Sequence, residues 1–166
     1  MKVRVVKIGG AALADSSWME VFARAAATAK TPMVIVHGGG PDISSLSDRL
    51  GIEVKWHEGR RVTSVETLDV AAMVLTGRVN KKVVGALVHA GVDAIGLSGI
   101  DGGLLRADVV ENGALGRVGR VSKVRVELLR GLITQGHTVV ISPISQGVDG
   151  GALNVNADDA AAAIAT

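Results

Sequence analysis

Residues 33–50 read MVIVHGGGPDISSLSDRL, and this stretch decides the fold. A β-branched apolar run from Met33 to Val36 ends in His37 and three glycines, and apolar residues then return at helical spacing from Ile43 to Leu50. Pro41 suits the first turn of a helix, where an N–H would have no partner. The stretch therefore predicts a buried strand, a glycine loop and a helix in succession, the repeating unit of an α/β sheet.

The same alternation continues on both sides of this unit. Further strands are predicted from Val3 to Ile8, from Val92 to Leu97 and from Thr138 to Ile144. Helices are predicted from Trp18 to Ala29, from Val65 to Ala90, where Gly77 bends or divides the pattern, and from Val124 to Ile133. This order favours a parallel sheet covered by helices.

Two segments carry hairpin patterns. Residues 102–122 have the turn-type pair Asn112-Gly113 between two β-rich arms, and a second hairpin from Ile144 to Asn154 turns near Asp149-Gly150-Gly151. We expect an α/β fold, a three-layer αβα sandwich whose mainly parallel sheet has these β-hairpins added at one edge.

Composition excludes several classes of function. The 166 residues are 48% hydrophobic and 20% charged, a globular balance, and no apolar run approaches the ~20 residues of a membrane span. The first residues do not resemble a signal peptide, so we expect a cytoplasmic protein. The absence of cysteine excludes disulfides and thiol nucleophiles, and a net charge of +2 with scattered Lys and Arg disfavours nucleic acid.

The end of the sequence predicts that the chain continues. ADDAAAAIA, from Ala157, begins a helix with acidic residues in its first turn, but Thr166 arrives without a glycine stop or a capping pattern. We therefore expect residues 1–166 to form one structural unit of a longer protein.

Two glycine motifs follow predicted strands, where ligands of open α/β sheets bind. Lys7-Ile8-Gly9-Gly10 offers backbone N–H groups and a mobile positive charge to a phosphate, although a strand-ending turn with a surface lysine is the commoner meaning of such a tetrapeptide. His37-Gly38-Gly39-Gly40-Pro41 opens a helix whose free N–H groups attract anions, and here His37 is also compatible with a structural cap. Neither motif is GxGxxG or GxxxxGK[ST].

Two polar motifs are candidates for binding a substrate. Residues 59–63 read GRRVT before the long helix, where Thr63 or Ser64 suits the cap; a guanidinium pairs naturally with a carboxylate, but arginines there are also compatible with solvated or interface charges. Asn154 and Asn156 share one face if the strand continues through them. Asp158 either caps the following helix or steers a lysine, and Asp159 competes for both roles.

Other chemistry is disfavoured. The four histidines lack HxxxH or HxH spacing, so we expect no metal site built from the chain, and Mg²⁺ would arrive with a nucleotide. Ser98, in the loop from Gly96 to Gly102, has no paired base in the pattern, so serine hydrolysis is discounted and the loop is expected to lie beside the site.

In their order along the chain, these motifs together with Gly77-Arg78-Val79-Asn80-Lys81 resemble the N-acetylglutamate kinases of the amino-acid kinase superfamily, which has a carbamate kinase-like fold. The resemblance implies ATP-dependent phosphorylation of the γ-carboxylate of N-acetyl-L-glutamate, in arginine biosynthesis. It gives catalytic roles to Lys7 and Asp158, nucleotide phosphate contacts to Lys7, Gly9 and Gly10, and substrate contacts to Gly39, Gly40, Arg61, Asn154 and Asn156. An ionised carboxylate needs no strong base, so charge neutralisation and alignment suffice.

The resemblance also has limits. It covers the amino-terminal, acetylglutamate-binding half, so the carboxyl-terminal ATP domain is absent and we expect the fragment alone to be inactive. Ile100 stands where these kinases often have lysine, which leaves open a kinase for carrier-linked aminoadipate or glutamate. Lys7 lies only six residues from the start, without the long amino-terminal helix of the arginine-inhibited hexamers of this family, so the resemblance implies a homodimer without arginine feedback. A non-catalytic arginine-binding domain stays open as well and, more distantly, so does a dinucleotide-binding fold.

Overall fold

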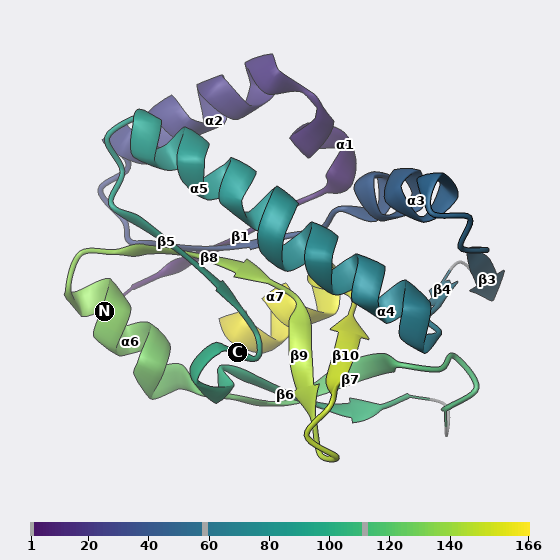
Figure 1. Ribbon diagram of the computed structural model, residues 1–166. Helices are drawn as coiled ribbons and strands as arrows, with labels where there is room; N and C mark the ends of the chain where they lie inside the picture. Colours follow the sequence, from purple (N-terminus) through teal and green to yellow (C-terminus); the bar gives the residue numbers. More distant parts are fainter. Residues whose placement is uncertain (1, 58–59, 111–112) are drawn as a thin grey trace.

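The computed structural model describes residues 2–57, 60–110 and 113–166. Gly59 of the arginine motif and Asn112 of the first predicted turn lie outside the described residues. The predicted fold class is confirmed: a parallel sheet lies between two layers of helices (Figure 1).

The central sheet has four parallel strands in the order β1-β2-β8-β5. They are β1 (Arg4–Ile8), β2 (Met33–His37), β8 (Thr138–Ser142) and β5 (Ala94–Ser98). All five residues of β2 and of β8 are buried, as expected for the two central strands of a covered parallel sheet. In the register of the first pair Ile8 lies opposite His37. The two glycine motifs therefore leave the sheet side by side.

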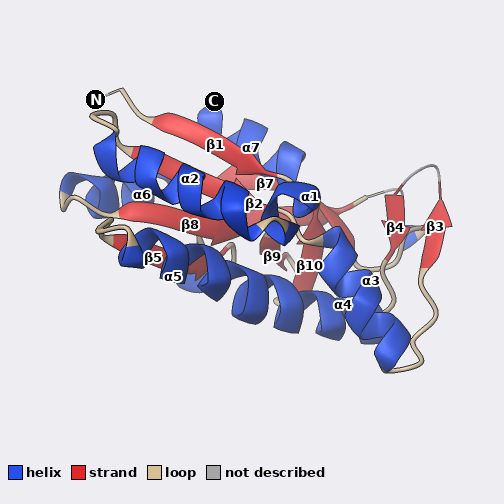
Figure 2. Ribbon diagram, turned by 90° about the horizontal axis from the view of Figure 1, so that it is seen from above, coloured by secondary structure: helices blue, strands red, loops and turns tan. Residues whose placement is uncertain are grey.

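Helices cover both faces of this sheet. One face carries α2 (Ser16–Thr28), α4 (Val65–Ala72) and α5 (Asn80–His89), and the other carries α6 (Val126–Thr134) and α7 (Ala157–Ala165) (Figures 1 and 2). Each face of the sheet has its own hydrophobic core, and strand β2 contributes to both. Ile35 packs on the side of α2 and α5, and its neighbours Val34 and Val36 pack on the side of α6 and α7. Two shorter helices, α1 (Gly10–Ala14) and α3 (Gly40–Arg49), begin at the glycine motifs.

The long predicted helix is continuous but changes its winding. A π-helical segment, η1 (Met73–Val79), joins α4 to α5 and contains Gly77, so the glycine does not divide the helix. Buried residues recur every four positions along it: Ala71, Leu75, Val79, Val83 and Leu87. In an unbroken α-helix each step of four residues drifts by about 40°. The wider turn of η1 offsets that drift and keeps both ends of the helix facing the sheet.

Both predicted hairpins exist, but they do not extend an edge of the parallel sheet, and that expectation was wrong. Strands β6 (Leu105–Val109), β7 (Val118–Val124), β9 (Ile144–Gly147) and β10 (Ala152–Val155) close on one another as a small barrel in the order β10-β7-β6-β9. Pro143 separates β8 from β9, and because proline has no N–H to continue a ladder, the chain leaves the sheet there.

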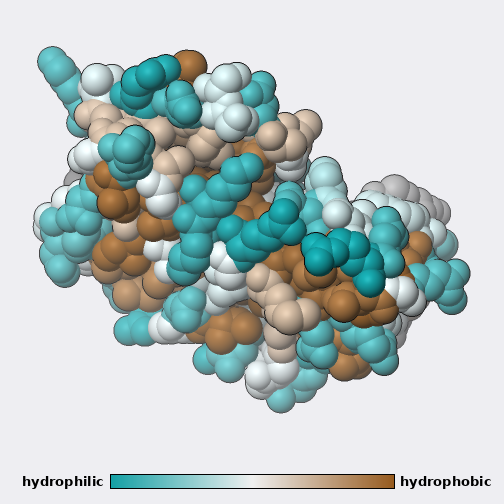
Figure 3. Space-filling model, turned by 45° about the horizontal axis from the view of Figure 1, so that its top comes forward, coloured by the Kyte–Doolittle hydropathy of each residue, from teal (hydrophilic) through white to brown (hydrophobic). Residues whose placement is uncertain are grey.

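Three short elements had no clear sequence pattern. They are the two-stranded sheet of β3 (Lys55–His57) and β4 (Arg60–Val62) and the 3₁₀ turn η2 (Asp101–Gly103). On the face formed by α2, α4 and α5, apolar and hydrophilic side chains are interspersed (Figure 3). No helix within the described ranges has both the length and the apolarity to cross a bilayer.

Candidate active site

A cavity of about 290 Å³ opens where β1, β2 and β10 end. Its volume is near the lower end of the range for small-molecule sites. Most of the predicted site residues line it: Lys7, Gly10, Gly39, Gly40, Arg61, Asn154, Asn156 and Asp158. Residues up to about 150 positions apart in sequence are therefore brought together, as the resemblance implies.

The two glycine motifs form one wall of the cavity. A Cβ on Gly10 would lie 2.6 Å from Pro41 Cδ, and a Cβ on Gly39 would lie 2.6 Å from Leu75 Cδ2, so both positions need glycine for close packing. Gly9 and Gly39 precede α1 and α3 as their N-caps. Within the described part of the chain their N–H groups donate to no protein acceptor, so they are available to an anion.

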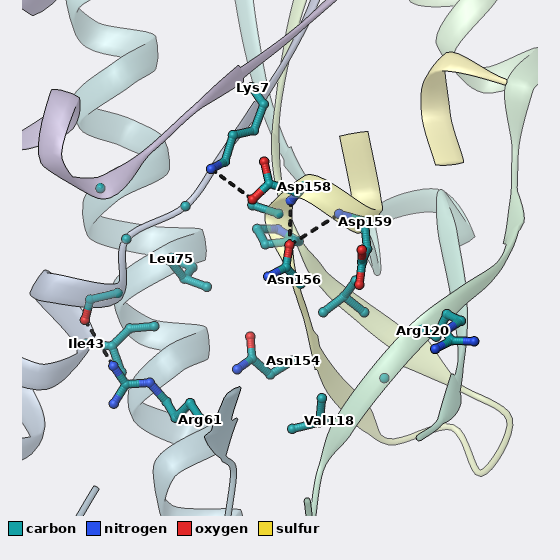
Figure 4. A pocket seen from close by; sticks show the side chains of 18 of the residues that line it. Lys7, Ile43, Arg61, Leu75, Val118, Arg120, Asn154, Asn156, Asp158 and Asp159 are labelled. Carbon is teal, nitrogen blue, oxygen red and sulfur yellow. Dashed lines mark hydrogen bonds and ion pairs between the residues drawn. The ribbon is translucent and has the colours of Figure 1, made fainter. Parts of the chain in front are cut away.

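Lys7 projects from β1 towards the first turn of α7. Its Nζ lies 3.1 Å from Asp158 Oδ2, and the lysine side chain is 32% exposed, so the ammonium is held but remains accessible (Figure 4). It also lies over the first glycine motif, 3.8 Å from the position of a Cβ on Gly9. Gly9 itself does not line the cavity.

Asn156, rather than either aspartate, caps helix α7. Its Oδ1 accepts from the backbone N–H of Asp158 at 2.7 Å and of Asp159 at 3.3 Å. Because the amide does the capping, the carboxylate of Asp158 is left to pair with Lys7. Of the two roles considered for Asp158, the structure therefore supports the lysine partner.

Arg61 lies at the end of the cavity away from Lys7, and its side chain packs against the first turns of helix α3. Its Nη2 donates to Ser44 Oγ at 2.8 Å and to Gly40 O at 3.2 Å, and its guanidinium carbon lies 4.6 Å from the ring centroid of Trp56. The residue is 8% exposed, and burial lowers the pKa of Arg61 while the charge of Asp48 opposes this shift. An arginine nevertheless stays charged.

One donor of Arg61 is left over. Within the described ranges, Nη1 is buried and has no hydrogen-bond partner. An unpaired buried donor on a charged group is costly, since burial removes its water without replacing it. A bound carboxylate is the natural acceptor, because it matches the guanidinium fork.

Asn154 faces the cavity from β10 and lies across from Arg61 (Figure 4). Its Nδ2 donates to Thr63 Oγ1 at 3.3 Å, and in the strand register it lies beside Val118 of β7. The two asparagines were expected on one strand face, but β10 ends at Val155 and Asn156 belongs to the helix cap. Both side chains reach the cavity all the same.

The loop from Gly96 to Gly102 does not line the cavity, contrary to expectation. Its first three residues are the end of β5, which is the edge strand farthest from β1 in the sheet order. Ser98 there is tied to Asp101, whose Oδ2 accepts from Ser98 N at 2.7 Å and from Ser98 Oγ at 2.9 Å. Ile100 therefore does not line this cavity.

Several contributing residues were missed by sequence reasoning. Ser44 lies one helical turn after Gly40, a spacing that places it beside the loop, and this was a usable signal. Trp56 comes from a short strand with no distinguishing pattern. Val118 and Arg120 come from an arm of the first predicted hairpin, and only the folded chain reveals that this arm borders the cavity.

The sequence was compared with known proteins. A sequence profile of the amino acid kinase family matches residues 2–166. An acetylglutamate kinase of Prochlorococcus marinus strain NATL1A is 42% identical over 164 residues, covering 97% of this chain and 54% of the relative. One from Methanopyrus kandleri is 45% identical over 171 residues, covering 98% of this chain and 66% of the relative.

The fold was also compared with solved structures. The smu.665 protein of Streptococcus mutans UA159 has a TM-score of 0.87 and 28% identity, covering 98% of this chain and 67% of that one. The chain spans about half the length of the Prochlorococcus relative.

Proposed function

This chain belongs to the amino acid kinase family, and we propose on that basis that it is the substrate-binding half of an acetylglutamate kinase. The reaction transfers the γ-phosphoryl group of ATP to the γ-carboxylate of N-acetyl-L-glutamate, giving N-acetyl-L-glutamyl 5-phosphate and ADP. The names of relatives 42% and 45% identical support this substrate.

The observation that carries the proposal is the buried, unpartnered Nη1 of Arg61. Its other fork nitrogen is already fixed by Ser44 and Gly40, so the guanidinium is preorganised for one ligand carboxylate. We assign the α-carboxylate of acetylglutamate to this position. Asn154, across the cavity, and Asn156 complete the polar contacts of the substrate.

The opposite end of the cavity suits the phosphoryl group. Lys7 offers an accessible ammonium beside the free N–H groups of the first glycine motif, and this set of donors fits the phosphates of a nucleotide. Mg²⁺ bound to ATP supplies further charge neutralisation, and we propose that it arrives with the nucleotide. Asp158 holds Lys7 in place.

The chemical step needs little beyond alignment. A γ-carboxylate oxygen attacks the γ-phosphorus, forming an O–P bond, while the bond to the β–γ bridging oxygen breaks and its electron pair leaves with ADP. The carboxylate is already ionised near pH 7, so no side chain must remove a proton. Lys7 and the glycine N–H groups stabilise charge on the transferring group.

This chain spans about half of the Prochlorococcus relative. We therefore propose the complete activity for the full-length protein and not for residues 1–166 alone. We propose that a second domain supplies the adenine pocket and a second phosphate-binding lysine. We also propose a cytoplasmic homodimer. Val65 and Met73, which are 62% and 56% exposed on the long helix, support a surface that a second copy covers.

Two experiments test the function. A hydroxamate assay for acyl phosphate, run on the full-length protein with ATP, compares acetylglutamate with glutamate, aspartate and aminoadipate derivatives; no product from any carboxylate would refute the kinase. Calorimetry of this chain with acetylglutamate and, separately, with arginine tests the binding half alone. Arg61→Ala should abolish acetylglutamate binding, whereas Arg78→Ala, at an exposed arginine outside the cavity lining, should not. Binding of arginine only would favour a regulatory domain.

A further inference from the structure

Asn80 is a fully buried asparagine that the proposed mechanism does not use. It is the first residue of α5, directly after the π-helical segment η1. Its Nδ2 lies 3.1 Å from Val140 O, 3.3 Å from Leu97 O and 3.2 Å from His37 Nε2. The amide therefore joins three neighbouring strands of the parallel sheet, and His37 contributes the one side chain among these three Nδ2 contacts.

Space for this amide is built into the sheet. A Cβ at Gly96 of β5 would collide with Asn80 Oδ1, which in turn accepts from Lys81 Nζ at 3.0 Å. The wider turn of η1 keeps Asn80 facing the strands, as it does for its buried neighbours on the helix. A buried amide at this position takes the place of an apolar side chain in the core. It is tolerated only because its polar atoms find hydrogen-bond partners.

These contacts select one tautomer of His37. Its Nδ1 lies 2.9 Å from Gly38 O, which can only accept, so Nδ1 carries the hydrogen. Nε2 faces the Asn80 amide, which donates, so Nε2 carries the lone pair. His37 is fully buried, and burial lowers the pKa of His37; the hydrogen bond to Gly38 opposes this shift and the charge of Lys81 adds to it. The ring is therefore neutral with its hydrogen on Nδ1.

The tautomer has a consequence for the glycine motif. In a trans peptide, the C=O of Gly38 and the N–H of Gly39 lie in one plane and point in opposite directions. Gly38 O is drawn towards the buried ring, so the Gly39 N–H points the other way. Gly39 lines the cavity, and its N–H has no protein acceptor within the described ranges.

We propose that Asn80 and His37 are positioning residues: Asn80 fixes the His37 tautomer, and His37 sets the Gly38–Gly39 peptide plane so that the Gly39 N–H donates to the bound substrate. This rests on the proposed function for the identity of the substrate. It assigns a role to the asparagine of the Gly77–Lys81 motif, which touches neither substrate nor nucleotide. The contacts themselves do not depend on the reaction.

A pair of amide substitutions separates positioning from packing. His37→Asn places its amide nitrogen near the position of Nδ1 and keeps the donor to Gly38 O, whereas His37→Gln reaches the position of Nε2 and loses that donor. In the full-length protein we expect His37→Asn to keep KM for acetylglutamate within about threefold of wild type and His37→Gln to raise it about tenfold or more, as for loss of one hydrogen bond to a charged group. KM for ATP should change less in both variants.

The control is Thr76→Val, which removes the 3.0 Å hydrogen bond between Thr76 and Ser142 from the same long helix to the same sheet. It should lower thermal stability without changing either KM. If His37→Gln and His37→Asn raise KM equally, or if His37→Gln is the better variant, His37 acts only through packing and the proposal is wrong.

A second measurement does not depend on activity, and its first part needs only the wild-type protein. In ¹⁵N NMR of the wild-type protein, the His37 ring should show a protonated Nδ1 and an unprotonated Nε2 between pH 6 and 8. In Asn80→Asp, where an acceptor replaces the donor, the Nε2 resonance should change to that of a protonated nitrogen. Protonated Nε2 in the wild type would overturn the proposal. A protein with the expected tautomer but no acetylglutamate turnover would instead refute only the proposed function.

Discussion

Replacing Gly39 by alanine tests how tightly the second glycine motif is packed. The added Cβ would lie 2.6 Å from Leu75 Cδ2 and 3.3 Å from Val79 Cγ2. Carbon atoms in contact normally lie about 3.5–4.0 Å apart, so Leu75 or the loop must move by roughly 1 Å. Leu75 and Val79 are only 3% and 2% exposed, and the free space beside Leu75 is the cavity itself, so Leu75 can move only at the expense of the site.

The expected cost of Gly39→Ala is that of overpacking a core, about 1–3 kcal/mol in the free energy of unfolding. Gly40→Ala is the matched control, because a Cβ on that neighbouring residue meets no atom within 4 Å. Since Gly40 also begins helix α3, where alanine loses less backbone entropy than glycine, the control should be neutral or slightly stabilising.

Urea unfolding of both variants measures the difference, and a double mutant identifies the cause. In a Leu75→Val background the Cδ atoms are gone, so Gly39→Ala should cost less than in the wild type, with a coupling energy of about 0.5–3 kcal/mol. Equal stability of Gly39→Ala and Gly40→Ala would contradict the steric reasoning. A full cost that persists without Leu75 would place the strain elsewhere in the loop.

Three further predictions concern charge. Lys7→Ala should lower kcat by about 10²–10³-fold, as for loss of a donor to developing charge, with little change in KM for acetylglutamate; unchanged turnover would remove Lys7 from catalysis. Arg61→Lys should raise KM for acetylglutamate about tenfold or more, because a point charge cannot replace the guanidinium fork; an unaltered KM would reassign Arg61. Because the pKa of His37 is lowered in the fold, the unfolded chain alone binds this proton below its ordinary pKa of 6.5, so stability should fall as the pH decreases below about 6.5, by up to about 1.4 kcal/mol per pH unit. Urea unfolding between pH 5 and 8 measures this dependence as the free energy of unfolding of the wild type minus that of His37→Asn, and this difference should increase as the pH rises. Identical pH profiles for the two proteins would disagree with a buried neutral ring.

The sequence predicted the features that depend on local patterns. The run from Met33 to Pro41 combines β-branched residues and a proline, which restrict the backbone, with glycines, which free it, and each effect acts without help from distant residues. The predicted strand ended one residue before its observed end at His37, whereas the helix, predicted from Ile43 to Leu50, is observed from Gly40 to Arg49. The candidate site followed because parallel strands end at the same edge of a sheet.

What could not be predicted depends on contacts between distant residues. The helix α1 has only five residues, too few for periodicity to be visible, and the barrel forms because β10 pairs with β7 rather than with the sheet. The role of Asp158 also depends on a distant residue. Asp158 pairs with Lys7, 151 residues away in the sequence, while Asn156 caps α7, and no local pattern encodes that ion pair.

The π-helical segment is the one part of the long helix whose length can change without altering which residues face the sheet. A π-helical turn holds about one residue more than an α-helical turn. Deleting one residue between Met73 and Val79 would therefore restore regular α-helical winding and leave Asn80 facing the strands. Deleting one residue within α4 or α5 would instead rotate the two ends of the helix by about 100° relative to each other. Among related chains, we therefore expect single-residue gaps in this helix to fall between Met73 and Val79.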